Sequence, residues 1–200
     1  MSTGKVIAAF TMSLDGFIAG PNDEVDRIMR WYFSGDTDFP VADGGMVFKL
    51  SRISAELVQE RFNTIGAIVT GRRDFDVSRA WGGRPPLPVP IFIVTHTPPQ
   101  EWAKEGSPFT FVTDGVESAV EQAKRAAGDK NVAVGSSKTT QQCLRAGLLD
   151  EIQIDLVPIL LGAGIRLFEH LGPEPIDLES IGAIDASGVT HLRFRVTKEH

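Results

Sequence analysis

Apolar residues along the chain occur in two alternating patterns. Short uninterrupted runs rich in β-branched residues predict four buried strands, at 5–13, 66–71, 90–96 and 131–135. Runs without polar alternation are typical of strands covered on both faces, as in parallel sheets. Elsewhere apolar residues recur at helical spacing, at 54–65 and 115–129, with Gly128 placed to end the second helix. Strands that alternate with helices predict an α/β fold.

The last third of the chain has a different pattern. At 151–157 and 190–196 apolar and polar residues alternate one by one, which predicts half-exposed antiparallel strands. We therefore expect a mostly parallel central sheet that is closed by a C-terminal antiparallel pair, with helices on both faces.

The segment at about 21–50 interrupts this order. It is acidic and rich in glycine and turn-forming residues, yet it contains the aromatic triplet "WYF" at 31–33. A loop of this length in a compact domain is usually functional or mobile. We expect a single domain over 1–200 with a long loop insertion at about 21–50, because 200 residues can bury one substantial core.

The bulk composition narrows the function classes. The net charge of −6 argues against nucleic-acid binding, which depends on excess Lys and Arg, although a local basic pocket for a nucleotide stays open. The lone Cys143 can form no internal disulfide. No segment has the features of a signal peptide or reaches the ~20 apolar residues of a membrane span. We expect a cytoplasmic protein that binds neither nucleic acid nor membrane.

The stretch "GSSKTT", at 135–140, stands where a predicted strand becomes a helix. A helix N-terminus presents unpaired N–H groups and a partial positive charge, which suit a phosphate. Gly135 permits close backbone approach, the hydroxyls can donate hydrogen bonds, and Lys138 adds a charge. The stretch is neither a Walker A loop nor G-x-G-x-x-G. Taken alone, it is also explained by helix capping, for which Ser and Thr are favoured.

Two further strand ends have a similar character. They place small, hydroxylated or basic residues at the same edge of the predicted sheet: Gly71, Arg72, Arg73, Thr95, His96 and Thr97. Arginine forks suit phosphates, although an exposed basic turn paired with Asp74 and Asp76 is the alternative. Ligands of open α/β sheets bind at the carboxyl ends of strands. Three such ends indicate one extended ligand with several phosphates, which a dinucleotide would satisfy.

Four segments, in this order, resemble the dihydrofolate-reductase-like superfamily: "TMSLDGFIAG", "TGRRDFD", "IFIVTHTPP" and "VGSSKTTQQCLRAGLLDEIQIDLVPILLGAGIRLF". The resemblance is closest to the C-terminal reductase domain of the bifunctional riboflavin-biosynthesis deaminase-reductase, and it covers nearly the whole chain. It implies a three-layer dihydrofolate-reductase-like α/β fold and a homodimer. It also implies NADPH as cofactor and a pyrimidine ribityl or ribosyl phosphate as substrate.

The resemblance also implies roles by position. Ser13 would lie near the nicotinamide, 71–73 near the phosphates, 95–97 along the adenosine 2′-phosphate and 135–141 against the pyrophosphate. The implied cofactor-binding set is Ser13, Gly71, Arg72, Arg73, Thr95, His96, Thr97, Gly135, Ser136, Ser137, Lys138, Thr139, Thr140 and Gln141. Several positions depart from the family pattern, among them Ser78, which stands where an aspartate often follows the second motif. Asp74 puts a carboxylate beside the expected phosphates, and Val134 stands where an acidic residue binds the pyrimidine.

Three residues are candidates for the substrate end. Asp15, in "SLDG", could position substrate or relay a proton, or it could hydrogen bond its own turn. Trp31, as part of the aromatic triplet with Tyr32 and Phe33, could stack on a planar substrate, or the triplet could anchor the long segment or a dimer contact by burial. Arg84 could contact a substrate phosphate.

We therefore interpret the chain as an NADPH-dependent reductase that transfers hydride to a small planar substrate, namely a pyrimidine, a pterin or a carbonyl compound. No strong general acid stands out, which leaves a bound water as the proton source. The alternative is a dinucleotide-binding or sensing module without catalysis, which Val134 and Asp74 favour. The H-x-E and P-C-x-x-C signatures of zinc deaminases are absent from the sequence, and we expect no metal site.

Overall fold

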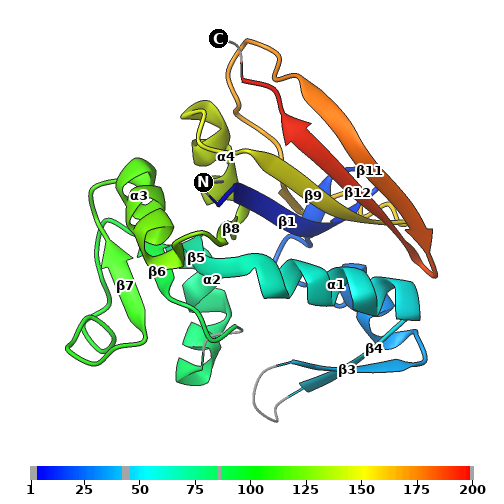
Figure 1. Cartoon of the computed structure of the whole chain (residues 1–200), viewed down its shortest axis with the longest axis horizontal. Helices are drawn as coiled ribbons and strands as arrows, with labels where there is room; N and C mark the ends of the chain where they lie inside the picture. The colour runs from blue at the N-terminus through cyan, green and yellow to red at the C-terminus, as the bar shows by residue number, and fades with distance from the viewer. Residues whose placement is uncertain (1–3, 42–45, 85–86, 199–200) are drawn as a thin grey trace.

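The computed structural model describes residues 4–41, 46–84 and 87–198. Its centre is an eight-stranded sheet with the order β11-β12-β9-β1-β8-β5-β6-β7 (Figure 1). The strands that pair in parallel are β1 (Val6–Ser13), β5 (Ile65–Gly71), β6 (Ile91–Val94), β7 (Phe109–Val112), β8 (Asn131–Val134) and β9 (Glu151–Val157). Two antiparallel strands, β12 (Val189–Val196) and β11 (Leu178–Ala186), close the sheet beside β9. The mostly parallel α/β sheet predicted from the sequence is confirmed.

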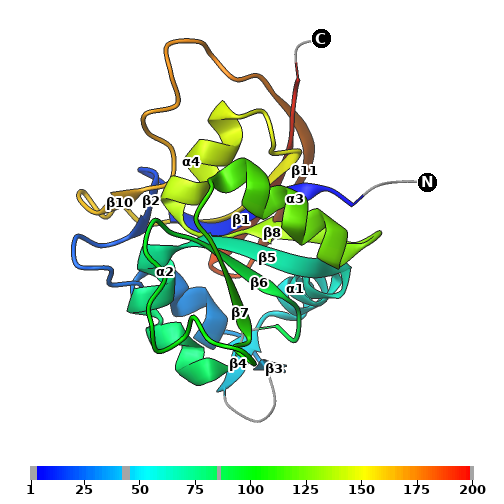
Figure 2. The ribbon, with the colours of Figure 1, turned by 90° about the vertical axis from the view of Figure 1, so that its left-hand side faces the viewer.

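Helices cover both faces of this sheet, as the pattern predicts. The helices are α1 (Arg52–Thr64), α2 (Arg72–Val77), α3 (Val116–Ala127) and α4 (Ser137–Arg145). Figures 1 and 2 show α3 and α4 on one side of the sheet and α1 and α2 on the other. The largest apolar core lies under α3 and α4 and contains Val69, Val134 and Ala119. None of the helices in the described ranges is long and apolar enough to cross a membrane.

The segment at about 21–50 has more regular structure than the expected loop. It contains a 3-10 helix, η1 (Ile28–Phe33), and the antiparallel strands β3 (Thr37–Val41) and β4 (Met46–Leu50). Apolar side chains explain this regular structure, because Trp31, Phe39 and Leu50 are buried in a second core with Val58 of α1. The segment therefore packs as a small lobe on the α1 face of the sheet.

The alternation at 151–157 was misleading in one respect. Strand β9 lies inside the sheet, between β1 and β12, and its polar residues Gln153 and Asp155 are buried rather than exposed. Burial is tolerated because these side chains are hydrogen bonded: Gln153 donates to Glu151, and Asp155 accepts from Arg61 of α1. Strand β12 lies between β9 and β11, and β11 is a largely exposed edge strand that the sequence pattern did not predict.

Candidate functional site

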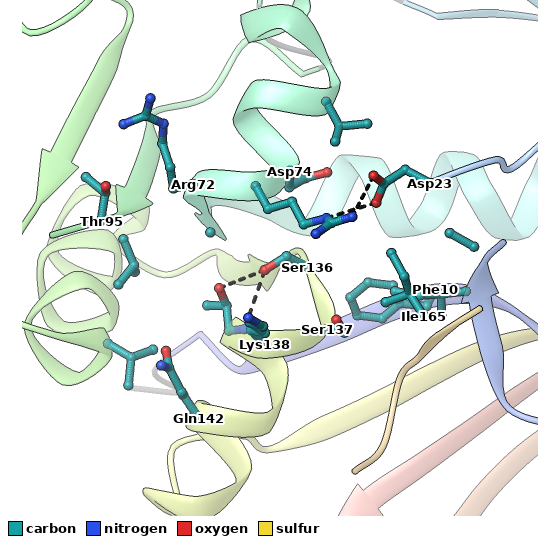
Figure 3. Close-up of a pocket in the computed structure, with 18 of the residues that line it drawn as sticks. Phe10, Asp23, Arg72, Asp74, Thr95, Ser136, Ser137, Lys138, Gln142 and Ile165 are labelled. Atoms are coloured by element: carbon teal, nitrogen blue, oxygen red, sulfur yellow. Dashed lines mark hydrogen bonds and ion pairs between the residues drawn. The ribbon is translucent and has the colours of Figure 1, made fainter. Parts of the chain in front are cut away.

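A large open cleft runs along the carboxyl ends of β5, β6 and β8 and has a volume of about 1500 Å³. It exceeds the roughly 300–1,000 Å³ that is usual for small-ligand pockets. In Figure 3, Arg72 and Thr95 lie at one end of the cleft and Phe10 and Ile165 at the other, with Ser136 and Lys138 between them. The strand-end residues singled out in the sequence therefore meet in one elongated site.

The N-terminus of α4 opens into the middle of this cleft. Its cap is Ser136, whose hydroxyl lies 2.8 Å from the Thr139 hydroxyl and accepts from the Thr139 N–H at 3.4 Å. In the first turn of α4, the Thr140 N–H donates to the Ser136 carbonyl. The N–H groups of Ser137 and Lys138 come before this bond, where a helix offers its N–H groups no carbonyl partner of its own. Both residues line the cleft, and Lys138 adds a positive charge there. Capping and an anion-accepting helix end therefore coexist.

Ser136 has an unusual backbone, with φ 60° and ψ 143°. This conformation is sparsely populated for any residue other than glycine, and it costs about 1–3 kcal/mol. Such strain persists only where the surroundings impose it. Here it turns the chain from β8 into α4 beside the cleft.

Two glycines allow the ends of β5 and β8 to approach each other. A Cβ at Gly71 would lie 2.9 Å from the Ser136 Oγ, and one at Gly135 would lie 2.8 Å from the Thr70 Oγ1. Both distances are shorter than real Cβ atoms show, so a side chain at either position would force the facing hydroxyl to move. Gly71 lines the cleft, whereas Gly135 lies behind it and serves the packing.

Arg72 and Arg73 begin α2 and take different partners. The Arg72 Nε donates to Asp76 at 2.8 Å, and its Nη1 donates to the Thr97 carbonyl at 2.6 Å. Arg73 makes a two-pronged ion pair with Asp23, with Nε–Oδ1 and Nη2–Oδ2 distances of 3.0 and 2.8 Å. Arg72 therefore makes one of the aspartate pairs, with Asp76, that the alternative of an exposed basic turn predicted. Both arginines nevertheless line the cleft.

Asp74 also lines this part of the cleft, near Ser136 (Figure 3). Its carboxylate accepts a hydrogen bond from the Thr70 hydroxyl at 2.8 Å. Burial raises the pKa of Asp74, and the Thr70 hydrogen bond offsets only part of that rise. A carboxyl that is more readily neutralised repels a phosphate less than an ordinary aspartate would.

The opposite end of the cleft is apolar. It is built by β1, η1, the short strand β2 (Phe17–Ala19) and its antiparallel partner β10 (Ile165–Arg166). The lining residues there include Phe10, Ile18, Ile28, Met29 and Ile165, with the polar residues Thr11 and Tyr32 among them. This end suits a flat, weakly polar group, while the α2 and α4 end suits an anion.

Most of the predicted cofactor-binding residues line the cleft: Gly71, Arg72, Arg73, Thr95, His96, Thr97, Ser136, Ser137, Lys138 and Thr139. The remaining predicted residues do not. Thr140 is fully buried and donates to the Ser136 carbonyl, and the Gln141 amide donates to the Leu167 carbonyl. Their helix faces point into the core, so they hold α4 in place and do not face a ligand.

Asp15 and Ser13 do not line the cleft either. The Ser13 hydroxyl is buried and donates to Asp15 Oδ1 at 2.6 Å, and it accepts from the Phe17 N–H. The Asp15 carboxylate also accepts from the N–H groups of Leu161 and Gly162. The Ser13 bond is the largest cause that lowers the pKa of Asp15 to about 2, so this group holds no proton to donate near neutral pH. The turn-stabilising alternative for Asp15 is the one that the structure contains.

Trp31 and Arg84 are also outside the cleft lining. The Trp31 ring is 3% exposed, and its Nε1 donates to Thr11 Oγ1 at 3.2 Å. It therefore anchors η1 by burial and has no face left for a substrate. Arg84 is exposed and follows the 3-10 turn η2 (Arg79–Gly83), which packs beside α2.

Sequence reasoning missed several lining residues. Tyr32 was considered only as one of the three adjacent aromatic residues at 31–33, and Asp23 was part of an expected loop. Thr113 follows β7, a strand that was not predicted, and Gln142 lies one helical turn after Lys138. The helical spacing of Lys138 and Gln142 is a signal that could have found the latter.

Metal ligands do not gather in the described ranges, where no group of three or more His, Cys, Asp or Glu side chains could hold an ion. The buried thiol of Cys143 lies in the main core, and burial raises its pKa to about 12. It therefore acts as a packing residue.

The sheet order, the helices on both faces and the cleft at the carboxyl edge define a protein of the dihydrofolate-reductase-like α/β class. The chain belongs to the family of RibD C-terminal domains, whose model matches residues 4–190. It is similar to protein YwjB of Bacillus subtilis, with 21% identity over 170 residues that cover 85% of this chain and 86% of YwjB.

Solved structures share the fold. A putative riboflavin biosynthesis protein from Shewanella sp. PV-4 superposes with a TM-score of 0.75 at 20% identity, covering 97% of this chain and 99% of that one. A diaminohydroxyphosphoribosylaminopyrimidine deaminase/5-amino-6-(5-phosphoribosylamino)uracil reductase from Thermotoga maritima gives 0.63 at 15% identity, covering 98% of this chain and 57% of that one. The family and fold expected from the sequence motifs are confirmed.

Proposed function

We propose that this protein is an NADPH-dependent reductase of a small planar substrate, such as a pyrimidine, a pterin or a carbonyl compound. One observation supports the proposal above all: turns after β5, β6 and β8, far apart in the sequence, line a single elongated cleft. One end of the cleft carries hydroxyls and the cations of Arg72, Arg73 and Lys138 beside the carboxylates of Asp23 and Asp74, and the other end is apolar. A dinucleotide that ends in a flat ring has the same two parts.

The cleft offers the types of residue that would bind the parts of NADPH. Arg72, Arg73 and Lys138 would neutralise phosphates, and the N–H groups that begin α4 would donate to them. Thr95 and Thr97 would lie along the adenosine end. When bound, NADPH supplies the hydride. The chain supplies the electrostatic hold on the phosphates and an apolar surface, lined by Phe10 and Ile165, that orients a flat ring and excludes water.

Binding is tested by titrating the protein with NADPH and following nucleotide fluorescence and thermal unfolding. Arg72→Ala is expected to weaken binding roughly 10- to 100-fold, the value of one charge-assisted hydrogen bond. Arg125→Ala is the matched control, because Arg125 also makes an i,i+4 ion pair on a helix, with Glu121, but does not line the cleft. Saturable binding that ignores both substitutions would contradict the site.

A second candidate function is a dinucleotide-binding or sensing module without turnover. Two observations favour it: Asp74 brings a carboxylate to the phosphate end, and Val134 is a buried core residue that cannot serve as an acidic substrate ligand. Consumption of NADPH with pterins, pyrimidines and quinones separates the two. Tight binding without consumption of NADPH by any of them supports the module.

We also propose that the protein acts as a homodimer, as its family resemblance implies, and that it works in the cytoplasm, as expected from its sequence. Sedimentation at several protein concentrations tests the assembly, because a reversible dimer dissociates on dilution.

A further inference from the structure

A row of polar side chains crosses the α1 face of the sheet behind the apolar end of the cleft. Thr11 of β1 is the register partner of Asp155 on β9, and Asp155 is the register partner of His191 on β12. The three strands are adjacent, and α1 lies over the same face (Figure 1). The row therefore runs from the interior of the α1 face to Thr11, which lines the cleft.

Hydrogen bonds connect the side chains in the interior part of this row. Arg61 of α1 donates to both oxygens of Asp155 at 2.9 Å, and His191 Nδ1 lies 2.7 Å from Asp155 Oδ1. His191 Nε2 in turn lies 2.9 Å from the Ser54 hydroxyl. Burial would raise the pKa of Asp155, but Arg61 and His191 outweigh burial and lower it. Asp155 is therefore a fixed negative charge inside the protein.

Tyr32 stands at the cleft end of the row. Tyr32 lines the cleft together with Thr11, and the Thr11 side chain is close enough to the Tyr32 hydroxyl to influence its pKa. The ring is held between Trp31 and Phe48, with centroids 4.0 and 4.6 Å away. Trp31 Nε1 donates to the same Thr11 hydroxyl. The position of the Tyr32 hydroxyl is therefore set by packing and by the row.

Charge and burial keep this hydroxyl protonated. Burial and the nearby Asp155 charge raise the pKa of Tyr32, and Arg61 and Thr11 lower it by less. Asp15, the other candidate acid, has no proton near neutral pH and does not line the cleft. Among the described lining residues of β1, β2, η1 and β10, Thr11 and Tyr32 are the two with a side-chain O–H, and a phenol is ordinarily the stronger acid of the two.

We propose that Tyr32 is the proton donor of the reduction, a role that rests on the proposed function. As the carbon of a substrate C=O or C=N bond accepts hydride from the reduced nicotinamide, the π electron pair moves to the oxygen or nitrogen. That atom takes the proton of the Tyr32 hydroxyl. The nicotinamide is oxidised, the substrate is reduced by two electrons, and the tyrosinate regains its proton from solvent water when product leaves. Thr11 and Asp155 are positioning residues that fix the hydroxyl and keep it neutral.

The chain offers an unusually direct test, because Tyr32 is its only tyrosine. In protein labelled with ¹³C at tyrosine Cζ, one resonance reports both the ionisation of this hydroxyl and the contents of the cleft. We expect the resonance to shift when NADP⁺ is added, and to stay that of a neutral phenol beyond the ordinary tyrosine pKa of ~10. A resonance that ignores NADP⁺ which thermal shift shows to be bound, or that titrates near the ordinary value, overturns the proposal.

Kinetics with Tyr32→Phe provide the second arm, with dihydrofolate as a C=N probe and menadione as a carbonyl probe. The variant keeps the ring, so we expect an unchanged Kd for NADPH and a reduction rate lowered by about 100-fold or more. Equal rates in both proteins overturn Tyr32 as donor while leaving the reductase function intact. If wild-type protein binds no NADPH, the proposed function fails as well. If neither probe is reduced, the labelled resonance alone decides.

Discussion

Asp23 and Arg73 form a two-pronged ion pair in the cleft, between the segment that precedes η1 and the first turn of α2. The pair occupies the guanidinium that a phosphate would need. Arg73 is 64% exposed, so water screens the pair and its own contribution to stability is small. Binding of a phosphate must therefore compete with Asp23 for the same donors.

Replacement of Asp23 by Asn should strengthen NADPH binding about two- to fivefold, because the competing charge is worth at most ~1 kcal/mol when exposed. Asn also tolerates the positive φ of 65° at this position, so the backbone is preserved. Fluorescence titration measures the Kd. Asp38→Asn, which breaks the exposed pair with Lys49 away from the cleft, is the control and should leave the Kd unchanged. Weaker binding in Asp23→Asn would show instead that Asp23 orients Arg73 for the ligand.

Asp74 should make nucleotide binding depend on pH. A bound phosphate raises the already elevated pKa of this carboxyl further, so binding takes up a proton and the affinity for NADP⁺ rises as pH falls. The measurement is the Kd for NADP⁺ in a series of buffers from acidic to neutral pH.

Two variants isolate the contribution of Asp74. In Asp74→Asn the pH dependence should flatten and binding at high pH should become several times tighter. Because His96 also lines the cleft, the proteins with Asp and with Asn at position 74 are compared a second time, both carrying His96→Gln. A pH profile that is identical with Asp and Asn at position 74 would show that this carboxyl does not sense the ligand.

Much of the fold could be predicted because the relevant signals are local. The strands at 66–71 and 131–135 are apolar on both faces, and the residues after them change abruptly to glycine, hydroxyl and cation. The resulting edge of the sheet follows from parallel topology alone. Strand β11 gave no such signal, since it lies at an exposed edge and its residues are mostly solvent-facing.

The polar residues of β9 mark where local reasoning stops. Alternation at 151–157 looks half-exposed, but Asp155 is buried because Arg61, distant in sequence, and His191 satisfy it. The same limit applies to Trp31 and Tyr32. In a 3-10 helix neighbouring side chains point about a third of a turn apart, so one can be buried while the next lines the cleft. Only the packing of η1 on β1 and β4 decides which one.

The strained turn at Ser136 predicts a stabilising substitution. Ser136→Gly removes the about 1–3 kcal/mol of backbone strain and loses only a few tenths of a kcal/mol of capping. We expect about 1 kcal/mol of net stabilisation, or a Tm higher by about 2–4 °C for a chain of this size. Ser136→Ala, which keeps the strain and loses the cap, should be destabilised by about 1 kcal/mol. Calorimetry compares the three proteins. The strain account fails if Gly proves no more stable than Ala at this position.

The Asp155–Arg61 pair predicts how the protein responds to acid. Since the pKa of Asp155 is lowered in the folded state, its contribution to stability is complete above the ordinary carboxyl value, and it is lost as pH falls through the depressed value. Asp155→Asn should remove that part of the acid sensitivity and cost about 3–5 kcal/mol at neutral pH, because Arg61 is left as an unpaired buried charge. Denaturant titrations from neutral to acidic pH measure both effects.

Glu179→Gln is the control variant. It breaks the exposed pair with Arg195 and should cost less than ~1 kcal/mol with little change in the pH profile. If the two variants lose similar amounts of stability, Asp155 does not hold a buried charge, and the basis for a neutral Tyr32 is removed with it.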